Sequence, residues 1–195
     1  MTQMREQIKI PLSKKKLILM LIGSMGFVVA GFWFVIKPPT NNNLFLGNPI
    51  VILLTGIVSI LIFGFCAFSY IRKILDNKPG LIIDNIGLTD NSSGVSVGQI
   101  LWNNIENISV IEIFGQKLIL IKINNPQEYI NKQMNCFKKK FAQINMNKYG
   151  TPLSITSNTL KIKFDELLNI LNNHLNASRK HNKRINNQRQ RKSHN

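Results

Sequence analysis

The side chains that most often carry catalysis are scarce in this chain of 195 residues. Its two cysteines are too few for a disulfide framework or a cysteine-rich zinc site, and its three histidines all lie in the last quarter. No P-loop, dinucleotide-binding or metal-binding motif is present. Asp165 and Glu166 are adjacent, but adjacent helical positions do not face each other, and carboxylates are favoured at a helix N-terminus. We therefore expect a protein that is not an enzyme and that needs no cofactor or metal.

Basic side chains are the more informative chemical feature, because lysine and arginine are attracted to anionic lipid headgroups. Lys and Arg number 25 against 9 Asp and Glu, which gives a formal net charge of +16. The candidate headgroup contacts are Lys132, Lys138, Lys139, Lys140, Arg179, Lys180, Lys183 and Arg184. For the lysines at 132–140, an ordinary solvated helix face is an equally good interpretation.

Residues 178–195 are predicted to form a disordered basic tail, because cations there stand among Asn and Gln with almost no apolar residue. This tail could lie on lipid, on RNA or on neither. It contains no Phe, Tyr or Trp that would stack on bases, so nucleic acid is the less favoured partner.

Two long uncharged runs, residues 17–36 and 49–70, could anchor such a basic surface at a membrane. An α-helix rises 1.5 Å per residue, so about 20 residues cross the roughly 30 Å of bilayer hydrocarbon. A cleaved signal peptide is the alternative for the first run, but that run is too long and no A-x-A site follows it. Residues 17–70 are therefore predicted to form a transmembrane hairpin. Neither run has an ionisable Asp, Glu, Lys, Arg or His, which argues against ion transport.

The orientation of the hairpin follows from its flanking cations. Lys14, Lys15 and Lys16 precede the first run and Arg72, Lys73 and Lys78 follow the second, whereas the loop between the runs holds only Lys37. Because cations are enriched in cytoplasmic segments, both termini are expected in the cytoplasm of a bacterium, with residues 1–16 as a basic cytoplasmic lead.

Gly26 and Ala30 are small residues four positions apart in the first run, a spacing that lets two membrane helices approach closely. We expect them to pack between the two spans. Contact between two copies of the chain is the less favoured alternative.

From residue 79 onward, short β-branched runs replace the long apolar ones. They recur every eight to twelve residues between Asn, Gly and Ser turns, which predicts a small antiparallel barrel or sandwich. Trp102 falls within this pattern and is expected in the core. One amphipathic helix is predicted after Asn125, because five apolar residues share a face: Ile130, Met134, Phe137, Phe141 and Ile144. A second begins near Phe164, with an apolar stripe of Leu167, Leu168, Leu171 and Leu175.

Several stretches of the chain resemble a family of small, functionally uncharacterised bacterial membrane proteins. The resemblance covers roughly residues 8–176 and is carried by residues 10–16, 78–105, 125–131, 149–152, 160–162 and 164–167. It implies two N-terminal transmembrane helices and a cytoplasmic pleckstrin-homology-like domain, without any catalytic residue. The expected fold is therefore α+β: the hairpin, then a pleckstrin-homology-like β barrel at 79–177 with an inserted amphipathic helix and a C-terminal capping helix.

Together these features favour a non-enzymatic inner-membrane protein. Its cytoplasmic domain is expected to bind acidic lipid of the inner leaflet or a protein partner. The alternative is a structural or assembly protein that acts only through protein–protein contacts, for which an exposed strand edge would suffice.

Overall fold

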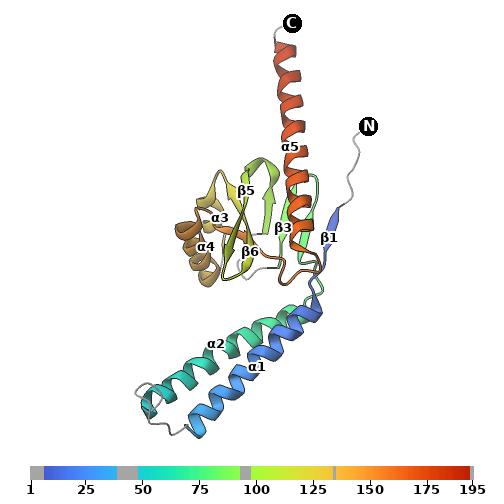
Figure 1. Cartoon of the computed structure of the whole chain (residues 1–195). Coiled ribbons are helices and arrows are strands. Elements are labelled where there is room, and N and C mark those ends of the chain that lie inside the picture. The colour runs from blue at the N-terminus through green and yellow to red at the C-terminus, as the bar shows by residue number, and fades with distance from the viewer. Residues whose placement is uncertain (1–6, 39–47, 93–97, 134, 194–195) are drawn as a thin grey trace. The chain divides into compact units, whose positions relative to one another are not determined.

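The computed structural model describes residues 7–38, 48–92, 98–133 and 135–193, and the chain divides into two compact units (Figure 1). One unit is Ser13–Asn77 and contains two helices. The other combines Met1–Leu12 with Lys78–Asn195 and contains strands and helices. The described residues 7–12, within the segment 1–16 expected to be a basic lead, therefore belong to the same unit as the residues after the hairpin.

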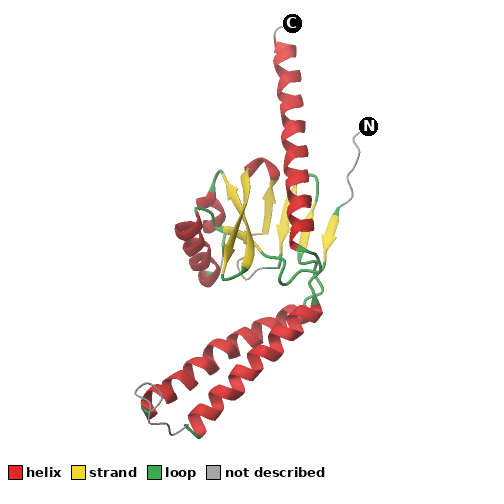
Figure 2. Ribbon diagram, viewed as in Figure 1, coloured by secondary structure: helices red, strands yellow, loops and turns green. Residues whose placement is uncertain are grey.

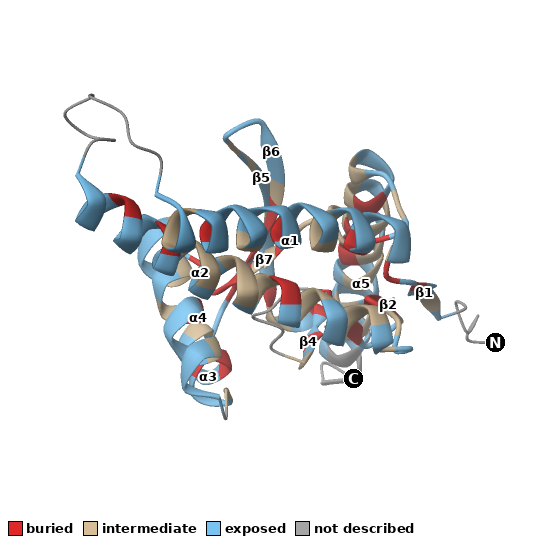
Figure 3. Cartoon of the chain, turned by 90° about the horizontal axis from the view of Figure 1, so that it is seen from below, coloured by how far each residue is buried: buried red, intermediate tan, exposed pale blue. Residues whose placement is uncertain are grey.

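The helical unit consists of α1 (Lys14–Ile36) and α2 (Pro49–Leu75). The side chain of Ser13 caps α1 by accepting a hydrogen bond from the Lys16 amide, and Asn48 caps α2 by accepting one from the Ile50 amide at 3.0 Å. Pro49 occupies the first turn of α2, where its missing N–H has no cost. Both helices are long and apolar enough to cross a membrane, as predicted from residues 17–36 and 49–70. Figure 3 shows that most of their surface is exposed.

Two glycines bring α1 and α2 together. A Cβ added at Gly31 would lie 2.9 Å from the Gly56 carbonyl oxygen, and one added at Gly56 would lie 2.8 Å from the Gly31 oxygen. The Ser59 hydroxyl donates to the Phe27 carbonyl oxygen across the same face at 3.0 Å.

The expected packing pair, Gly26 and Ala30, was the wrong one. Gly26 has nothing within 4 Å of an added Cβ, and Ala30 is exposed. Phe27 and Gly31 lie four positions apart on the contact face, and residues 26 and 30 are each one position earlier, which turns them about 100° away from it.

The second unit contains two antiparallel sheets (Figure 2). The first has the order β1 (Ile8–Ile10), β2 (Leu81–Ile83), β3 (Gly87–Asp90) and β4 (Gly98–Leu101). The second has the order β5 (Ile105–Ile113), β6 (Gln116–Ile123) and β7 (Leu153–Ile155). The sheets are not closed into the predicted barrel. A turn of 3₁₀ helix, η1 (Trp102–Asn104), redirects the chain between β4 and β5, so the hydrogen-bond ladder does not continue from one sheet to the next.

Strand β1 precedes the α1–α2 hairpin in the chain and pairs with β2, which follows it. Ile8 lies opposite Ile83 and Ile10 opposite Leu81. Next to this pair, Leu12 forms a single bridge with Leu160, and the Lys161 amide donates to the Pro11 oxygen at 2.9 Å. The α1–α2 hairpin is thus inserted between two neighbouring strands of one sheet.

Three helices complete the unit: α3 (Pro126–Asn131), α4 (Cys136–Tyr149) and α5 (Phe164–Ser193). Helix α5 packs against η1 and β5 and buries Leu167, Leu171 and Leu175 of the predicted apolar stripe, whereas Leu168, its fourth member, is half-buried. Trp102 is buried as predicted, stacks on His174 of α5, and donates to the Asp84 carbonyl oxygen at 2.8 Å.

The basic segment predicted to be disordered over 178–195 is helical through Ser193 as the continuation of α5. No glycine or proline follows Pro152 in the sequence, and Arg, Lys and Gln are good helix formers. Low hydrophobicity therefore excluded a packed core for this segment but did not exclude a helix.

Candidate lipid-contact surface

The eight predicted headgroup contacts lie on or directly after three different helices. Lys132 follows directly after α3, the three consecutive lysines lie on α4, and the remaining four cations lie on α5. The sequence placed them in two groups, and the structure separates Lys132 from Lys138, Lys139 and Lys140 by the break between α3 and α4.

Lys132 already has an anionic partner. Its Nζ lies 2.6 Å from Oε1 of Glu128, one helical turn earlier, and 5.7 Å from the centre of the Tyr129 ring. The hydrogen bond to the Glu128 carboxylate, followed by its charge, raises the pKa of Lys132 above its usual value. Because this ammonium is held by a carboxylate of its own helix, we place it outside the lipid-contact surface.

The single inserted helix predicted after Asn125 is in fact two helices. Asn135 begins α4 by accepting a hydrogen bond from the Phe137 amide at 2.9 Å, and this cap starts a new helix rather than extending α3. Gly150 ends α4 in the left-handed conformation, with φ of 71° and its amide bonded to the Met146 oxygen. Met134, one of the five predicted apolar positions, lies outside the described residues.

Helix α4 contacts the rest of the unit through its smallest residue. Ala142 is fully buried on the side that contacts β7, and Asn145 Nδ2 lies 3.5 Å from the Ser154 hydroxyl of that strand. A small side chain allows the helix backbone to approach the sheet closely. The opposite side of α4 consequently faces away from the protein core.

The apolar face predicted for this helix lies mainly on that outward side. Phe137, Phe141 and Ile144 are 74%, 54% and 48% exposed, whereas Ile130 is buried on α3. The predicted spacing holds within α4, and the structure adds that this part of the face is exposed. Positions 137, 141 and 144 are four and three residues apart, so the three side chains form one stripe.

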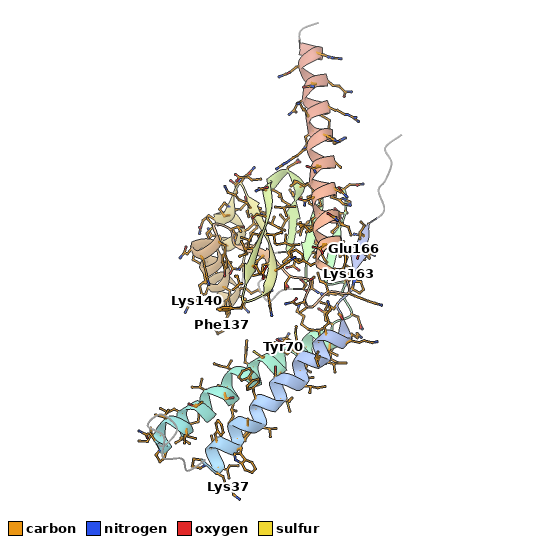
Figure 4. The ribbon with its side chains drawn as sticks, in the orientation of Figure 1. Lys37, Tyr70, Phe137, Lys140, Lys163 and Glu166 are labelled. Atoms are coloured by element: carbon orange, nitrogen blue, oxygen red, sulfur yellow. The ribbon has the colours of Figure 1, made fainter. Side chains whose placement is uncertain are left out.

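Lysines border this stripe on both sides. At about 100° per residue, Lys140 and Lys138 flank the stripe, Lys148 lies at its C-terminal end and Lys139 lies on the far side. Figure 4 shows Phe137 and Lys140 extending from α4 away from the sheets. The helix contains no Asp or Glu, so no residue of α4 neutralises these charges.

The cations of α5 form a second basic surface. Arg179 donates from its Nη2 atom to the Glu106 carbonyl oxygen, and Asn182 donates to the Asn103 side chain, which fixes this part of α5 against η1 and β5. Lys180, Lys183 and Arg184 are exposed beyond that contact. Unlike α4, this segment presents no stripe of large apolar side chains among its described residues.

Sequence reasoning overlooked one side chain, Phe114. It lies at the tip of the β5–β6 hairpin, is fully exposed, and adopts a φ of 49° beside Gly115 at 74°. A non-glycine residue in the left-handed region is uncommon, and the strain is about 1 kcal/mol. Only the structure shows that the Phe114 ring is fully exposed and contacts no core.

The two adjacent carboxylates noted in the sequence lie at the start of α5. Asp165 and Glu166 lie in the first turn of α5, where the helix dipole favours carboxylates. In the four described ranges, no group of three or more His, Cys, Asp or Glu side chains is placed to hold a metal ion.

Comparisons with protein-family models, with curated proteins and with solved structures found no match to this chain. The pleckstrin-homology-like assignment and the family resemblance therefore remain predictions. The confirmed part is coarser: two helices long and apolar enough to span a membrane, joined to a unit that contains two antiparallel sheets.

Proposed function

We propose that this chain is a non-enzymatic bacterial inner-membrane protein that spans the bilayer with α1 and α2. Its α+β unit, an open variant of the pleckstrin-homology-like fold, lies at the cytoplasmic face and binds acidic lipid of the inner leaflet. This proposal rests on the two apolar helices, on the way they are connected to the sheet, and on the basic surfaces of α4 and α5.

The pairing of β1 with β2 is the observation that carries the proposal. Neighbouring strands of a sheet must lie in one compartment, so the segments before α1 and after α2 lie on the same side of any membrane that the hairpin crosses. Only residues 11–13 connect β1 to α1, and only residues 76–80 connect α2 to β2. A chain extends at most about 3.5 Å per residue, so each of these two connections spans at most roughly 20 Å.

The flanking cations indicate on which side of the membrane these two segments lie. Lys14, Lys15 and Lys16 begin α1, and Arg72 and Lys73 lie in the last turn of α2. The other end of the hairpin has Lys37 alone. Because positive charge is retained in the cytoplasm during insertion, both flanks and the α+β unit belong there.

Cysteine labelling of the full chain in bacterial membranes tests this topology. In a Cys66→Ser background, we expect a membrane-impermeant maleimide to label the exposed Cys136 in inverted vesicles and to leave it unlabelled in intact spheroplasts. A Lys37→Cys variant that also carries Cys136→Ser is the matched control and should show the reverse pattern. Release of the chain by a carbonate wash, or labelling of Cys136 from outside, would refute the proposal.

A second function, in which the unit binds only protein, is favoured by the outer strand of the second sheet. Strand β5 pairs with β6 through eight residue pairs and has no second strand partner among the described residues, and Phe114 projects from the tip of this hairpin. An exposed edge can accept a strand from a partner, and an exposed aromatic ring is a common anchor in an interface.

Affinity capture from cross-linked membranes separates the two functions. If protein contact through the hairpin is the role, Phe114→Asn should lose a partner that the wild-type chain retains, while Phe141→Asn keeps it. Asparagine tolerates the left-handed conformation, so the first variant removes the ring without strain. Retention of the same partners by both variants would count against this second function.

A further inference from the structure

We propose that α4 is an interfacial helix whose stripe of Phe137, Phe141 and Ile144 enters the headgroup region of the anionic bilayer that contains α1 and α2. This inference rests on the proposed function and specifies the surface that meets lipid. It assigns α4 a role distinct from the sheets and from α5.

The exposed apolar stripe is the first argument. Three large apolar side chains, all roughly half exposed or more, follow one another along one side of a single helix. Elsewhere in the unit, the exposed large apolar residues of the described ranges are spread over separate elements: Ile86, Leu101, Val110 and Phe114. Single exposed apolar residues are ordinary, whereas a contiguous stripe marks a surface that meets another apolar phase.

The charge around the stripe identifies that phase as anionic lipid. Lys138 and Lys140 border the apolar residues and Lys148 ends the stripe, with no carboxylate on the helix. Helices that lie in the plane of a membrane combine an apolar face with flanking lysines in this way. A protein groove that covered the stripe would instead have to bury or pair these ammonium groups.

The connection to the spans supplies the second, independent argument. The unit that contains α4 is attached to the membrane helices through residues 11–13 and 76–80 alone, so these two short connections tether it to the bilayer that α1 and α2 would cross. A weak surface affinity therefore suffices, because a tethered site experiences a high effective concentration of lipid.

The internal side of α4 allows this contact without unfolding. Ala142 stays buried against the rest of the unit, and the caps at Asn135 and Gly150 define both helix ends. Only the outward side has to change its environment, from water to lipid. The helix is preformed, so no ordering of the backbone opposes binding.

Depth-dependent quenching in nanodiscs tests the proposal with the full chain. A bimane fluorophore on Phe141→Cys, in a Cys66→Ser/Cys136→Ser background, reports contact with spin-labelled lipid. The matched control carries the same probe at Asn173→Cys, an exposed position of α5. We expect strong quenching at 141 in nanodiscs with anionic lipid, weak quenching in neutral ones, and little at 173 in either.

A charge variant sharpens this test. Each lysine near an anionic leaflet strengthens binding about fivefold, so the triple change Lys138→Gln/Lys140→Gln/Lys148→Gln should lower the ratio of lipid-bound to free α4 on the order of 100-fold. Unquenched probe at 141 in anionic nanodiscs would overturn the proposal. Equal quenching in neutral and anionic nanodiscs would also overturn it, since lysines would then have no part.

The outcomes remain distinguishable from failure of the proposed function. If the chain resists carbonate extraction and Cys136 shows cytoplasmic labelling, yet the probe at 141 is unquenched, only the role of α4 is wrong. If carbonate releases the chain, the membrane anchoring itself is wrong. The melting temperature of each labelled variant, compared with that of the unlabelled chain, verifies that the fold is retained.

Discussion

Helices α4 and α5 belong to one unit and show the same kind of apolar periodicity, yet they use it in opposite ways. In α5 the stripe of Leu167, Leu171 and Leu175 is buried against η1 and β5. In α4 the stripe of Phe137, Phe141 and Ile144 is exposed, and the helix contacts the sheet through Ala142. A helical period therefore predicts that a stripe exists, but not what covers it.

The composition of the two stripes is consistent with this difference. The stripe of α5 consists of leucines, and its two acidic residues lie in the first turn. The stripe of α4 contains phenylalanine and is bordered by lysine, which has a long apolar stem and a charged end. Phenylalanine beside lysine suits the boundary between hydrocarbon and water.

The largest expected effect concerns the buried stripe. Leu171→Ala should lower the free energy of unfolding of the α+β unit by about 3 kcal/mol, because it removes buried methyl groups and leaves a cavity. Phe141→Ala, the matched change in α4, should alter it by less than about 0.5 kcal/mol. Urea unfolding followed by Trp102 fluorescence in a Trp33→Phe background measures both. Equal losses would refute the contrast between the helices.

The helical unit contains the same contrast between a buried and an exposed side. Gly31→Leu should destabilise the α1–α2 hairpin by about 2 kcal/mol, because an added side chain collides with the Gly56 carbonyl oxygen and with Ile60. Gly26→Leu should have almost no effect, since the space around it is open. The yield of a cysteine cross-link between the two helices checks this. Equal sensitivity of the two variants would show that the helices pack through a different face.

The smallest expected effect is a gain. Phe114→Asn should raise the stability of the unit by up to about 1 kcal/mol, because asparagine accepts a positive φ more readily than phenylalanine and no core contact is lost. Thermal unfolding of the two chains side by side measures the shift. A clear loss of stability would show that the ring packs in a way the hairpin geometry does not display.

The sequence predicted features that depend on local composition. Both spans were predicted because an uncharged apolar run of about 20 residues is typical of a membrane helix, and Trp102 was placed in the core because it lies within a strand pattern. Strand β1 was missed because three residues, Ile8–Ile10, carry too short a signal and their partner lies beyond two membrane helices. Closure of the barrel also depends on long-range pairing, which local patterns do not contain.

The candidate site, too, was predicted only in those features that depend on local sequence. The lysines at 138–140 were identified from charge alone, and the structure adds that exposed aromatic side chains lie beside them. The apolar positions at 137, 141 and 144 were identified from their spacing, but their exposure depends on which side of α4 meets the sheet. That choice rests on Ala142, a residue without any signal of its own in the sequence.

The pairing of β1 with β2 is the central claim, since it places both flanks of the hairpin in one compartment. Lys9 and Ile82 are directly opposite each other in the two strands, so Lys9→Cys/Ile82→Cys in a Cys66→Ser/Cys136→Ser background should form an intramolecular disulfide when isolated membranes are oxidised. Thr89, opposite Ile82 on the next strand, provides the control Lys9→Cys/Thr89→Cys. In this control the two cysteine sulfurs would lie about two strand spacings apart, roughly 10 Å, and should not form a disulfide. A cross-link in the first pair alone is the predicted result, and its absence, or equal cross-linking of both pairs, would contradict the account.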